Sequence, residues 1–387
     1  MKISVLQEDF LQKITLASRF VSSRAQIPIL GNILLKAQEG KLQISATNLE
    51  IGISASIGAK VQEPGDITIP AKILSEIIGN LRPGKIELEE KKGHLEISTA
   101  DFSASIAGIP AAEFPNVPSE LPITTFSLTK ETLSTLAKQI AFAAADTDTR
   151  PVLTGILLQF EEDRLIAVAT DGFRMSYTEL KTNSDLFNKE IETNKNKEEK
   201  QINNSGKQVL LPAKVIEELE KIANYDTEKI RVAVLEKEGK LLFGSESVVL
   251  TSRVLEGQFP DYNRVIPKDW TVKVIAGKDE LARAVKGAAV FARESASIIK
   301  LNIKQNQITI TSESNLHGKE EVTVEAKTEG ESTQIAYNYR YLLDFFNSVS
   351  KETISLETQG STAPGVFQDT SDSTYKHIIM PVRIQNN

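Results

Sequence analysis

The segment Val5-Leu-Gln-Glu-Asp-Phe-Leu11, close to the N-terminus, has two counterparts further along the chain. Leu128-Thr-Lys-Glu-Thr-Leu133 and Ala276-Gly-Lys-Asp-Glu-Leu281 also place an acidic residue shortly before a leucine. All three run into stretches with apolar residues at every third or fourth position, the period of an amphipathic helix; these stretches are 11–21, 133–144 and 281–292. The repetition predicts three related units, each beginning with a helix.

A second helix start also occurs three times. Ile69-Pro-Ala-Lys72 and Leu211-Pro-Ala-Lys214 each place a proline ahead of an apolar periodic stretch, and Tyr337-Asn-Tyr-Arg340 places an asparagine there. Proline at the first helical position and asparagine at the cap both favour helix initiation. Each unit is therefore predicted to hold two helices.

The spacing between the two landmarks shows where the units differ. From the leucine that closes the first landmark to the proline or asparagine of the second is 59 residues in the first unit, 79 in the middle unit and 57 in the third. The middle interval contains residues 181–206, a run rich in Lys, Glu and Asn with too few apolar residues to fold alone. We interpret this run as a polar insertion and predict domains at 1–124, 125–268 and 269–387.

Short segments of alternating polarity lie between the predicted helices. Such alternation is typical of half-buried antiparallel strands, and it occurs at 40–46, 85–90, 94–98, 239–243 and 307–311. The predicted fold class is therefore α+β, with three similar domains of about 120 residues that each place two helices on antiparallel sheets.

Composition limits the kind of chemistry that the chain can perform. It has 387 residues and three histidines. It has no cysteine, which excludes disulfide scaffolds, thiolate metal sites and cysteine nucleophiles. Glu8 and Asp9 interrupt the apolar run that a signal peptide needs, and no stretch of about 18 apolar residues occurs. We expect a cytoplasmic protein with no membrane contact, no metal and no cofactor.

An enzyme remains as an alternative, although the familiar catalytic motifs are missing. No phosphate-binding or dinucleotide-binding glycine loop and no Gly-x-Ser-x-Gly elbow is present. Asp146 and Asp148 would suit a metal-dependent hydrolase, but their charged surroundings favour an exposed loop. Asp171-Gly172 follows an apolar run and is a turn signal. Tyr262 and Trp270 could stack on bases, and we expect them instead to be buried anchors at a domain junction.

The charge distribution suits helices that face a polyanion. The whole chain has 45 Lys and Arg against 52 Asp and Glu. The six predicted helices together have 14 against 11, counted over 7–22, 70–82, 129–145, 212–224, 278–294 and 338–351. The helices are therefore mildly basic on an acidic body, an arrangement that favours sequence-independent contact with nucleic acid.

Five segments carry a more specific signal than the repeat. They are 27–32 (IPILGN), 170–175 (TDGFRM), 252–267 (SRVLEGQFPDYNRVIP), 337–344 (YNYRYLLD) and 375–384 (YKHIIMPVRI). In this order they resemble signatures of the bacterial sliding clamp family, the beta subunit of DNA polymerase III. The resemblance covers the whole chain except 181–206. Phe173 stands where the family usually has histidine, and 385–387 extend past the usual end.

The resemblance implies a non-catalytic, ring-shaped protein. The family forms a head-to-tail homodimer whose six domains surround duplex DNA without sequence specificity, with helices lining the hole. Its partners would be the DNA polymerase III catalytic subunit, the clamp loader and other proteins with a clamp-binding motif. A hydrolase and a non-ring repeat protein that binds only proteins are the competing hypotheses.

The resemblance also assigns residues to three surfaces, each carried over position by position. DNA-facing positions would be Arg24 and Lys72. The dimer interface would comprise Phe102, Ile106, Val290 and Phe291. A groove between the second and third domains would bind a partner peptide through Leu153, Thr170, Gly172, Phe173, Arg174, Met175, Pro260, Arg264, Val265, Met380, Pro381, Val382 and Arg383.

Overall fold

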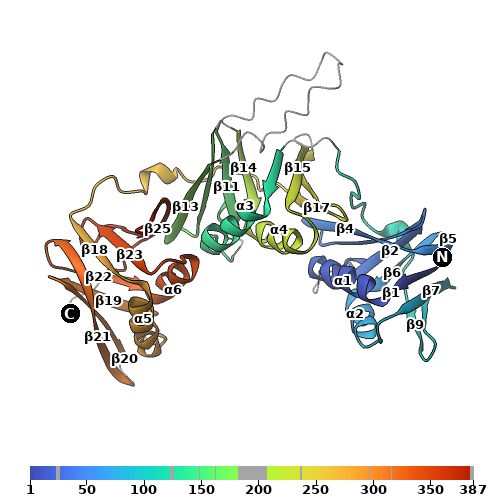
Figure 1. The fold of residues 1–387 in the computed structure, drawn as a ribbon, viewed down its shortest axis with the longest axis horizontal. Coiled ribbons are helices and arrows are strands. Elements are labelled where there is room, and N and C mark those ends of the chain that lie inside the picture. The colour runs from blue at the N-terminus through green and yellow to red at the C-terminus, as the bar shows by residue number, and fades with distance from the viewer. Residues whose placement is uncertain are drawn as a thin grey trace, which may run out of the picture. The chain divides into compact units, whose positions relative to one another are not determined.

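The structure is a computed structural model that describes residues 1–22, 27–122, 126–147, 149–161, 163–181, 207–235, 238–294, 296–314 and 316–383. The described residues fall into two compact units (Figure 1). Unit 1 comprises 1–130 and 218–254, and unit 2 comprises 131–181, 207–217 and 255–383. The predicted insertion lies outside the described residues except for its first residue.

Unit 1 is built on two antiparallel sheets. The larger has the strand order β10-β15-β16-β17-β4-β3-β2-β6 and the smaller β5-β1-β7-β8-β9. The strands are β1 (Lys2–Leu6), β2 (Asn32–Gln38), β3 (Lys41–Thr47), β4 (Ile51–Gly58), β5 (Lys60–Glu63), β6 (Gly65–Pro70), β7 (Lys85–Lys91), β8 (His94–Ser98), β9 (Ser103–Ala107), β10 (Phe126–Thr129), β15 (Lys229–Leu235), β16 (Lys240–Gly244) and β17 (Val248–Arg253).

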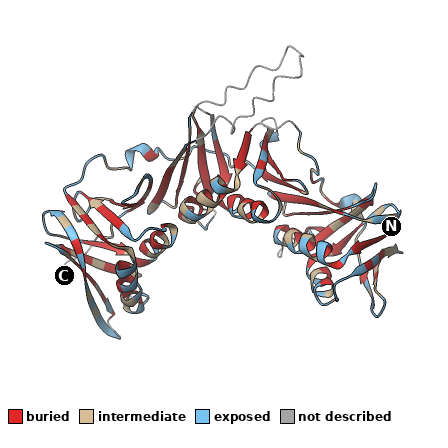
Figure 2. Ribbon diagram, viewed as in Figure 1, coloured by how far each residue is buried: buried red, intermediate tan, exposed pale blue. Residues whose placement is uncertain are grey.

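The helices of unit 1 bury one face and leave the other to solvent (Figure 2). Helix α1 (Gln7–Ala17) buries Phe10, Ile14 and Ala17, and α2 (Ala71–Gly79) buries Leu74 and Ile78. These residues recur at the three- and four-residue steps that the sequence predicts. The C-terminal part of α4 (Ala213–Asp226) also belongs to unit 1, and short 3₁₀ segments are η1 (Ser18–Phe20), η2 (Pro28–Gly31) and η3 (Ala111–Glu113).

Unit 2 contains one long antiparallel ladder with the order β14-β11-β12-β13-β25-β24-β23-β18-β21-β20-β19-β22. Its strands are β11 (Gly155–Phe160), β12 (Arg164–Thr170), β13 (Arg174–Lys181), β14 (Lys207–Pro212), β18 (Val272–Gly277), β19 (Ile298–Lys304), β20 (Gln307–Ser314), β21 (Gly318–Gly330), β22 (Thr333–Asn338), β23 (Thr353–Thr358), β24 (Gly365–Asp369) and β25 (Asp372–Ile379). Helices α5 (Lys278–Ala292) and α6 (Tyr339–Ser348) pack together beside it.

The helix starts follow the predicted landmarks. Pro70 and Pro212 each end a strand, and α2 and α4 begin at the next residue. Asn338 caps α6, because its side-chain oxygen accepts a hydrogen bond from the Arg340 amide at 3.0 Å. Gly277 is the residue before α5, which begins three residues ahead of the predicted stretch 281–292.

The first helix of the middle repeat differs from the prediction of one continuous helix. It begins as α3 (Lys130–Thr135) and continues as a π-helical turn η4 (Leu136–Ile140) and a 3₁₀ turn η5 (Ala141–Ala143). The apolar spacing still buries Leu133, Leu136 and Ile140 on one side. Apolar periodicity therefore located the helical segment but could not distinguish the hydrogen-bonding pattern within it.

All sheet pairings among the described strands are antiparallel, so the predicted α+β class is confirmed. Two of these pairings connect repeats: β17 pairs with β4 in unit 1, and β13 pairs with β25 in unit 2. The sheets therefore continue from one repeat into the next. For this reason the compact units divide the middle repeat instead of coinciding with the three repeats.

The two aromatic anchors that we predicted have different environments. Tyr262, in the 3₁₀ turn η9 (Tyr262–Arg264), is 7 % exposed and its ring lies 5.8 Å from that of Tyr177. Trp270 is 39 % exposed, so its predicted burial is wrong. The Nζ of Lys273 lies 5.5 Å from its ring, a cation–π contact that stabilises the indole at the surface.

Candidate functional site

A cavity of about 440 Å³ in unit 2 is the candidate site. Its walls come from the turn between β12 and β13, the end of β25, the segment 259–265 and η6 (Pro151–Thr154). The lining residues are Arg150, Leu153, Thr170, Gly172, Phe173, Arg174, Met175, Phe259, Pro260, Tyr262, Arg264, Val265, Pro364, Ile378 and Met380.

The turn between β12 and β13 is held by its own side chains. The Thr170 hydroxyl donates to the Arg174 carbonyl at 2.6 Å and accepts from the Gly172 amide at 3.0 Å. The Asp171 carboxylate accepts from the Phe173 amide at 2.8 Å and from the Arg174 amide at 2.9 Å. Gly172 has a φ of 92°, a region that glycine adopts without steric cost. These contacts make the turn a fixed wall of the cavity.

The side chain of Arg174 connects this turn to two other segments of unit 2. Its guanidinium pairs with Asp171 at 3.1 Å and with Asp344 of α6, and donates to the Phe142 carbonyl at 2.6 Å. It also lies 4.6 Å from the centre of the Tyr341 ring. With its side chain only 10 % exposed, Arg174 acts as a structural link rather than as a free cation.

The rim of the cavity is apolar and accessible, while its floor is buried. Phe173, Met380 and Val265 are 65 %, 41 % and 36 % exposed, whereas Leu153 and Met175 are buried. The Met380 amide donates to the Phe173 carbonyl at 2.9 Å, so the two most exposed apolar residues of the cavity are held side by side. An apolar side chain from a ligand would displace water from both the rim and the floor.

The structure brings ten of the thirteen predicted groove positions to this cavity. Pro381, Val382 and Arg383 stay predicted peptide contacts, but they do not line this cavity. The reason is the path of the backbone, since the Val382 amide donates to the Ala336 carbonyl of β22 at 2.8 Å and directs the chain away.

Five lining residues escaped the sequence prediction, namely Arg150, Phe259, Tyr262, Pro364 and Ile378. Phe259 lies next to the predicted Pro260 in the motif 252–267, and this position was a usable signal. Pro364 and Ile378 reach the cavity only through the β24–β25 hairpin pairing.

Among the cations of the site, Arg264 is 86 % exposed in its side chain and pairs with Asp261 at 2.9 Å.

Behind the cavity, a buried histidine is held neutral. His377 of β25 is fully buried, shares a 2.8 Å hydrogen bond with the Ser176 hydroxyl and stacks on Phe345 at 5.8 Å between ring centres. Burial, reinforced by the charge of Arg174, lowers the pKa of His377 to about 3. No described group pairs with its Nε2 atom. His377 is therefore a core residue.

Acid should destabilise the fold through His377. In the unfolded chain His377 has its ordinary pKa of about 6.5, whereas in the folded protein its pKa is about 3. Between these two pH values only the unfolded chain binds the proton, so the free energy of unfolding falls as the pH drops. Between pH 7 and 4.5 this residue should contribute a loss of roughly 2–3 kcal/mol. Urea melts of the parent and His377→Phe at both pH values measure the difference; an equal acid loss in both would contradict it.

The predicted DNA-facing residues are only partly described. Lys72 is exposed on α2. Arg24 lies outside the described residues. Asp148 lies outside the described residues, and no group of three or more potential metal ligands occurs in the part of the chain that the structure describes. No described helix has the length and apolar character to cross a membrane.

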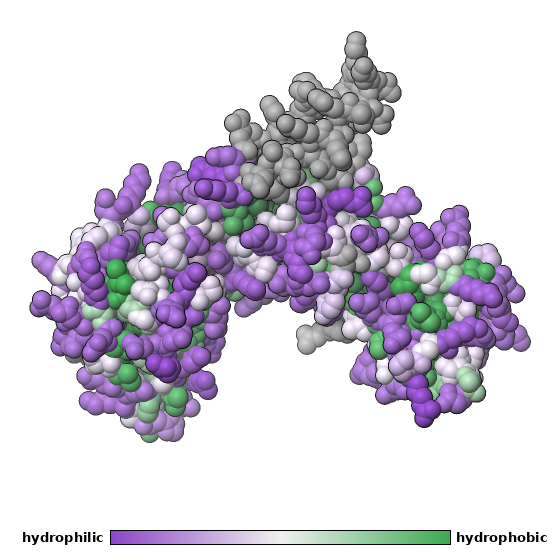
Figure 3. Space-filling model, viewed as in Figure 1, coloured by the Kyte–Doolittle hydropathy of each residue, from purple (hydrophilic) through white to green (hydrophobic). Residues whose placement is uncertain are grey.

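The predicted interface residues differ in accessibility. Val290 is 62 % and Phe102 37 % exposed, and Phe291 is half-buried. Figure 3 shows hydrophobic side chains among hydrophilic ones around the end of unit 2 that carries α5 and β20. Ile106 is 5 % exposed because it points from β9 into the core of unit 1, and its assignment to the dimer interface stays a prediction.

Three family models match almost the whole chain. They describe the N-terminal, central and C-terminal domains of the DNA polymerase III beta subunit and match residues 1–118, 127–261 and 263–383. The beta sliding clamp of Synechocystis is 30 % identical and that of Escherichia coli K12 27 % identical; the alignments cover 100 % and 99 % of this chain and 100 % of each relative.

Solved structures agree with the sequence relatives. The sliding clamp of Bacillus subtilis superposes with a TM-score of 0.89 at 26 % identity and covers 100 % of both chains. The beta subunit from Thermotoga maritima gives 0.88 at 26 % identity, with coverage of 99 % of this chain and 100 % of that one. The chain therefore belongs to the DNA polymerase III beta subunit family, the non-catalytic sliding clamps with a three-domain α+β fold.

Proposed function

We propose that two copies of this chain close head to tail into a ring of six domains that encircles duplex DNA and tethers the replicative polymerase. The full-length match to the three beta subunit domains carries this proposal. We place the domain boundaries near residues 124 and 268; the first lies between the matched ranges 1–118 and 127–261, and the second lies shortly after the start of the range 263–383. A heterologous contact that closes after two subunits gives such a ring.

Contact with DNA in this proposal is weak and independent of sequence. A ring that surrounds the duplex needs no tight binding to DNA, because the closed ring of two subunits itself prevents escape. The helices need only a mildly positive field, as in the count of 14 basic against 11 acidic residues over the predicted helices. Lys72, exposed on α2, is a proposed phosphate contact, and Arg24 is proposed on the resemblance alone.

The 440 Å³ cavity is the proposed docking site for the DNA polymerase III catalytic subunit, the clamp loader and other clamp-binding proteins. Its exposed apolar rim fits a leucine or aromatic side chain in an extended peptide. Methionine at the rim can adjust to different partners because its side chain is flexible. Phe173 adds an apolar surface where a histidine would titrate, so binding should change little between pH 5 and 7.

The Met380→Ala variant should bind a labelled peptide of the polymerase catalytic subunit about tenfold more weakly, a loss of ~1.4 kcal/mol. The substitution removes an exposed apolar side chain from the cavity. It leaves in place the hydrogen bond that the backbone amide of residue 380 donates to the Phe173 carbonyl. Fluorescence anisotropy measures the affinity. Ser373→Ala, an exposed change on β25, the strand that precedes Met380, is the matched control. Unchanged affinity in Met380→Ala would show that the cavity is only a packing feature.

Two strand edges support the proposed subunit contact. β9 pairs with β8 on one side, and no described strand pairs with its other side. In β21, residues 318–325 pair only with β20 within the described chain. Unpaired strand edges readily pair with another chain. Phe102 precedes β9, and Val290 and Phe291 lie on α5, which packs on β20 and β21.

The Val290→Glu variant should be monomeric in native mass measurement, where the parent shows twice the chain mass of 42.6 kDa. The side chain is 62 % exposed, so the new charge is tolerated in the monomer but would be buried without a partner in the dimer. Leu49→Glu, at a half-exposed leucine of unit 1, should leave the dimer intact. A dimeric Val290→Glu protein would place the interface elsewhere.

A further inference from the structure

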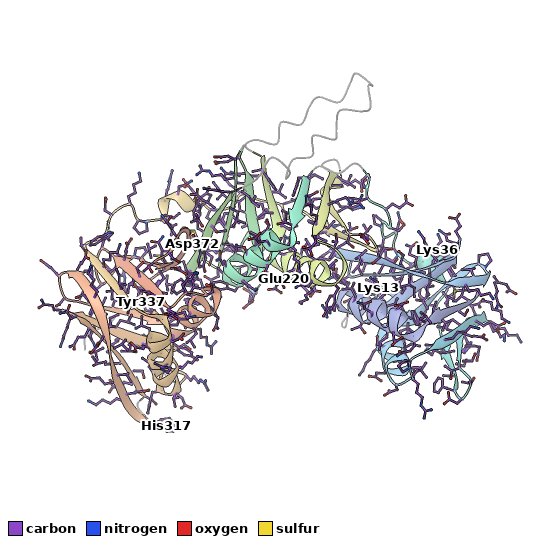
Figure 4. The ribbon with its side chains drawn as sticks, in the orientation of Figure 1. Lys13, Lys36, Glu220, His317, Tyr337 and Asp372 are labelled. Atoms are coloured by element: carbon purple, nitrogen blue, oxygen red, sulfur yellow. The ribbon has the colours of Figure 1, made fainter. Side chains whose placement is uncertain are left out.

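A second cavity, of about 210 Å³, lies in unit 1 between α1 and α4. We call it the α1–α4 cleft. Leu16, Ile222 and Val248 give it apolar surface, and Val248 is buried. Arg19 and Lys221 line it from the two helices, and Tyr225 stands in the last turn of α4. Figure 4 labels Lys13, another lining residue, on α1 and Glu220 on α4.

The cleft has a positive lining. None of the described residues that line it carries a carboxylate. The nearby Glu218, with its side chain 7 % exposed, pairs with both Arg19 at 3.2 Å and Lys221 at 2.7 Å. Because one carboxylate serves two cations, the three charges leave a net positive charge at the cleft. Arg19 and Lys221 remain 41 % and 43 % exposed in their side chains and can also reach an anion.

Tyr225 gives the cleft an accessible aromatic face. Its side chain is 78 % exposed, which is exceptional for a ring of this size on a folded domain. An aromatic ring beside a cationic groove is the usual platform for single-stranded nucleic acid, because every base can stack on it while the cations hold the phosphates. The bases of a duplex are already paired and stacked, so they cannot enter such a cleft.

We propose that the α1–α4 cleft binds an unpaired nucleotide of single-stranded DNA. The base stacks on Tyr225 above the apolar residues of the cleft, and the flanking phosphates lie beside Arg19 and Lys221. The proposal rests on the proposed role of the helices as the DNA-facing surface, and it adds a preference for unpaired strands that encirclement alone does not require. An acidic peptide would use the cations but gain less from the aromatic face.

The test compares fluorescein-labelled oligothymidine of 12 nucleotides with a duplex of equal length, using the full-length dimer at about 50 mM salt. The parent should bind the single strand more tightly. Tyr225→Ala should weaken single-strand binding about tenfold and leave duplex binding within twofold, since base stacking is lost. Tyr225→Phe should keep the affinity, because the ring and not the hydroxyl carries the contact. Trp270→Ala, at another exposed aromatic beside a lysine, is the matched control and should change nothing.

Three results would overturn the proposal. They are equal affinity of Tyr225→Ala and the parent for oligothymidine, an equal loss in Tyr225→Phe, and binding of a poly-glutamate peptide but not of oligothymidine. Retention of the loaded protein on circular duplex DNA is measured separately. If Tyr225→Ala is retained normally while single-strand binding is unchanged, the cleft proposal fails and the proposed ring stands. If the parent itself is not retained, the ring proposal fails whatever the oligonucleotides show.

Discussion

On closed circular duplex DNA, the loaded protein should remain bound for as long as the circle stays closed, and a single cut that linearises the DNA should release it. The proposed attachment is topological, so escape requires either an open ring or a free DNA end. The mildly basic helices give only weak, salt-sensitive attraction, which lets the ring move along the duplex until it reaches an end. We expect the fraction retained to fall at least tenfold on linearisation.

Gel filtration of DNA-bound protein before and after restriction cleavage measures this difference. An ATP-driven clamp loader must be present, because a closed ring does not thread itself. The Val290→Glu variant supplies the control, since a protein that cannot close a ring should be lost from circular and linear DNA alike. Equal retention of the parent on both forms would rule out encirclement and favour ordinary surface binding.

The substitution Arg174→Met should destabilise the protein by about 3 kcal/mol and abolish peptide binding. The guanidinium joins Asp171, Asp344 and the Phe142 carbonyl, and its removal leaves both carboxylates without their partner. Breaking a buried ion pair by removing one member commonly costs about 3–5 kcal/mol. Asp344 is 40 % exposed and can regain water, so the lower end of this range is expected.

Urea unfolding monitored by circular dichroism measures the loss of stability, and anisotropy of the labelled peptide measures binding. Arg264→Met is the matched control for the stability measurement, because that side chain is 86 % exposed and its pair with Asp261 should contribute at most about 1 kcal/mol. Arg174→Lys should restore little, since an ammonium cannot serve three acceptors in the geometry of a guanidinium. A fully stable Arg174→Met protein would mean that Arg174 is not a structural link.

Much of the architecture could be predicted from local patterns. The three helix starts directly after Pro70, Pro212 and Asn338 follow from residues whose backbone preferences act within one helical turn. The strand predicted at 94–98 is β8, with the same bounds. These predictions were possible because the periodicity of apolar residues indicates which face of a helix or strand is buried, whichever element packs against that face.

The candidate groove depended partly on resemblance and partly on the path of the backbone. Ten predicted positions meet at the cavity, whereas the C-terminal segment bonds to β22 through Val382 and leaves it. Ile106 shares a strand with accessible residues but points inward, because side chains alternate between the two faces of a strand. Which face of a strand points into the core depends on how the strands pair in the assembled sheet.

The sequence by itself determined the threefold repeat, the α+β class and the family, because these depend on local periodicity and on motifs that are continuous in the chain. The tertiary structure alone decided how the repeats join, through the β17–β4 and β13–β25 pairings. It also decided what Arg174 does. Its partners include the Asp344 carboxylate, 170 residues away in the chain. No local sequence pattern could therefore show that the Arg174 side chain, which the resemblance assigned to a partner peptide, is already paired within the fold.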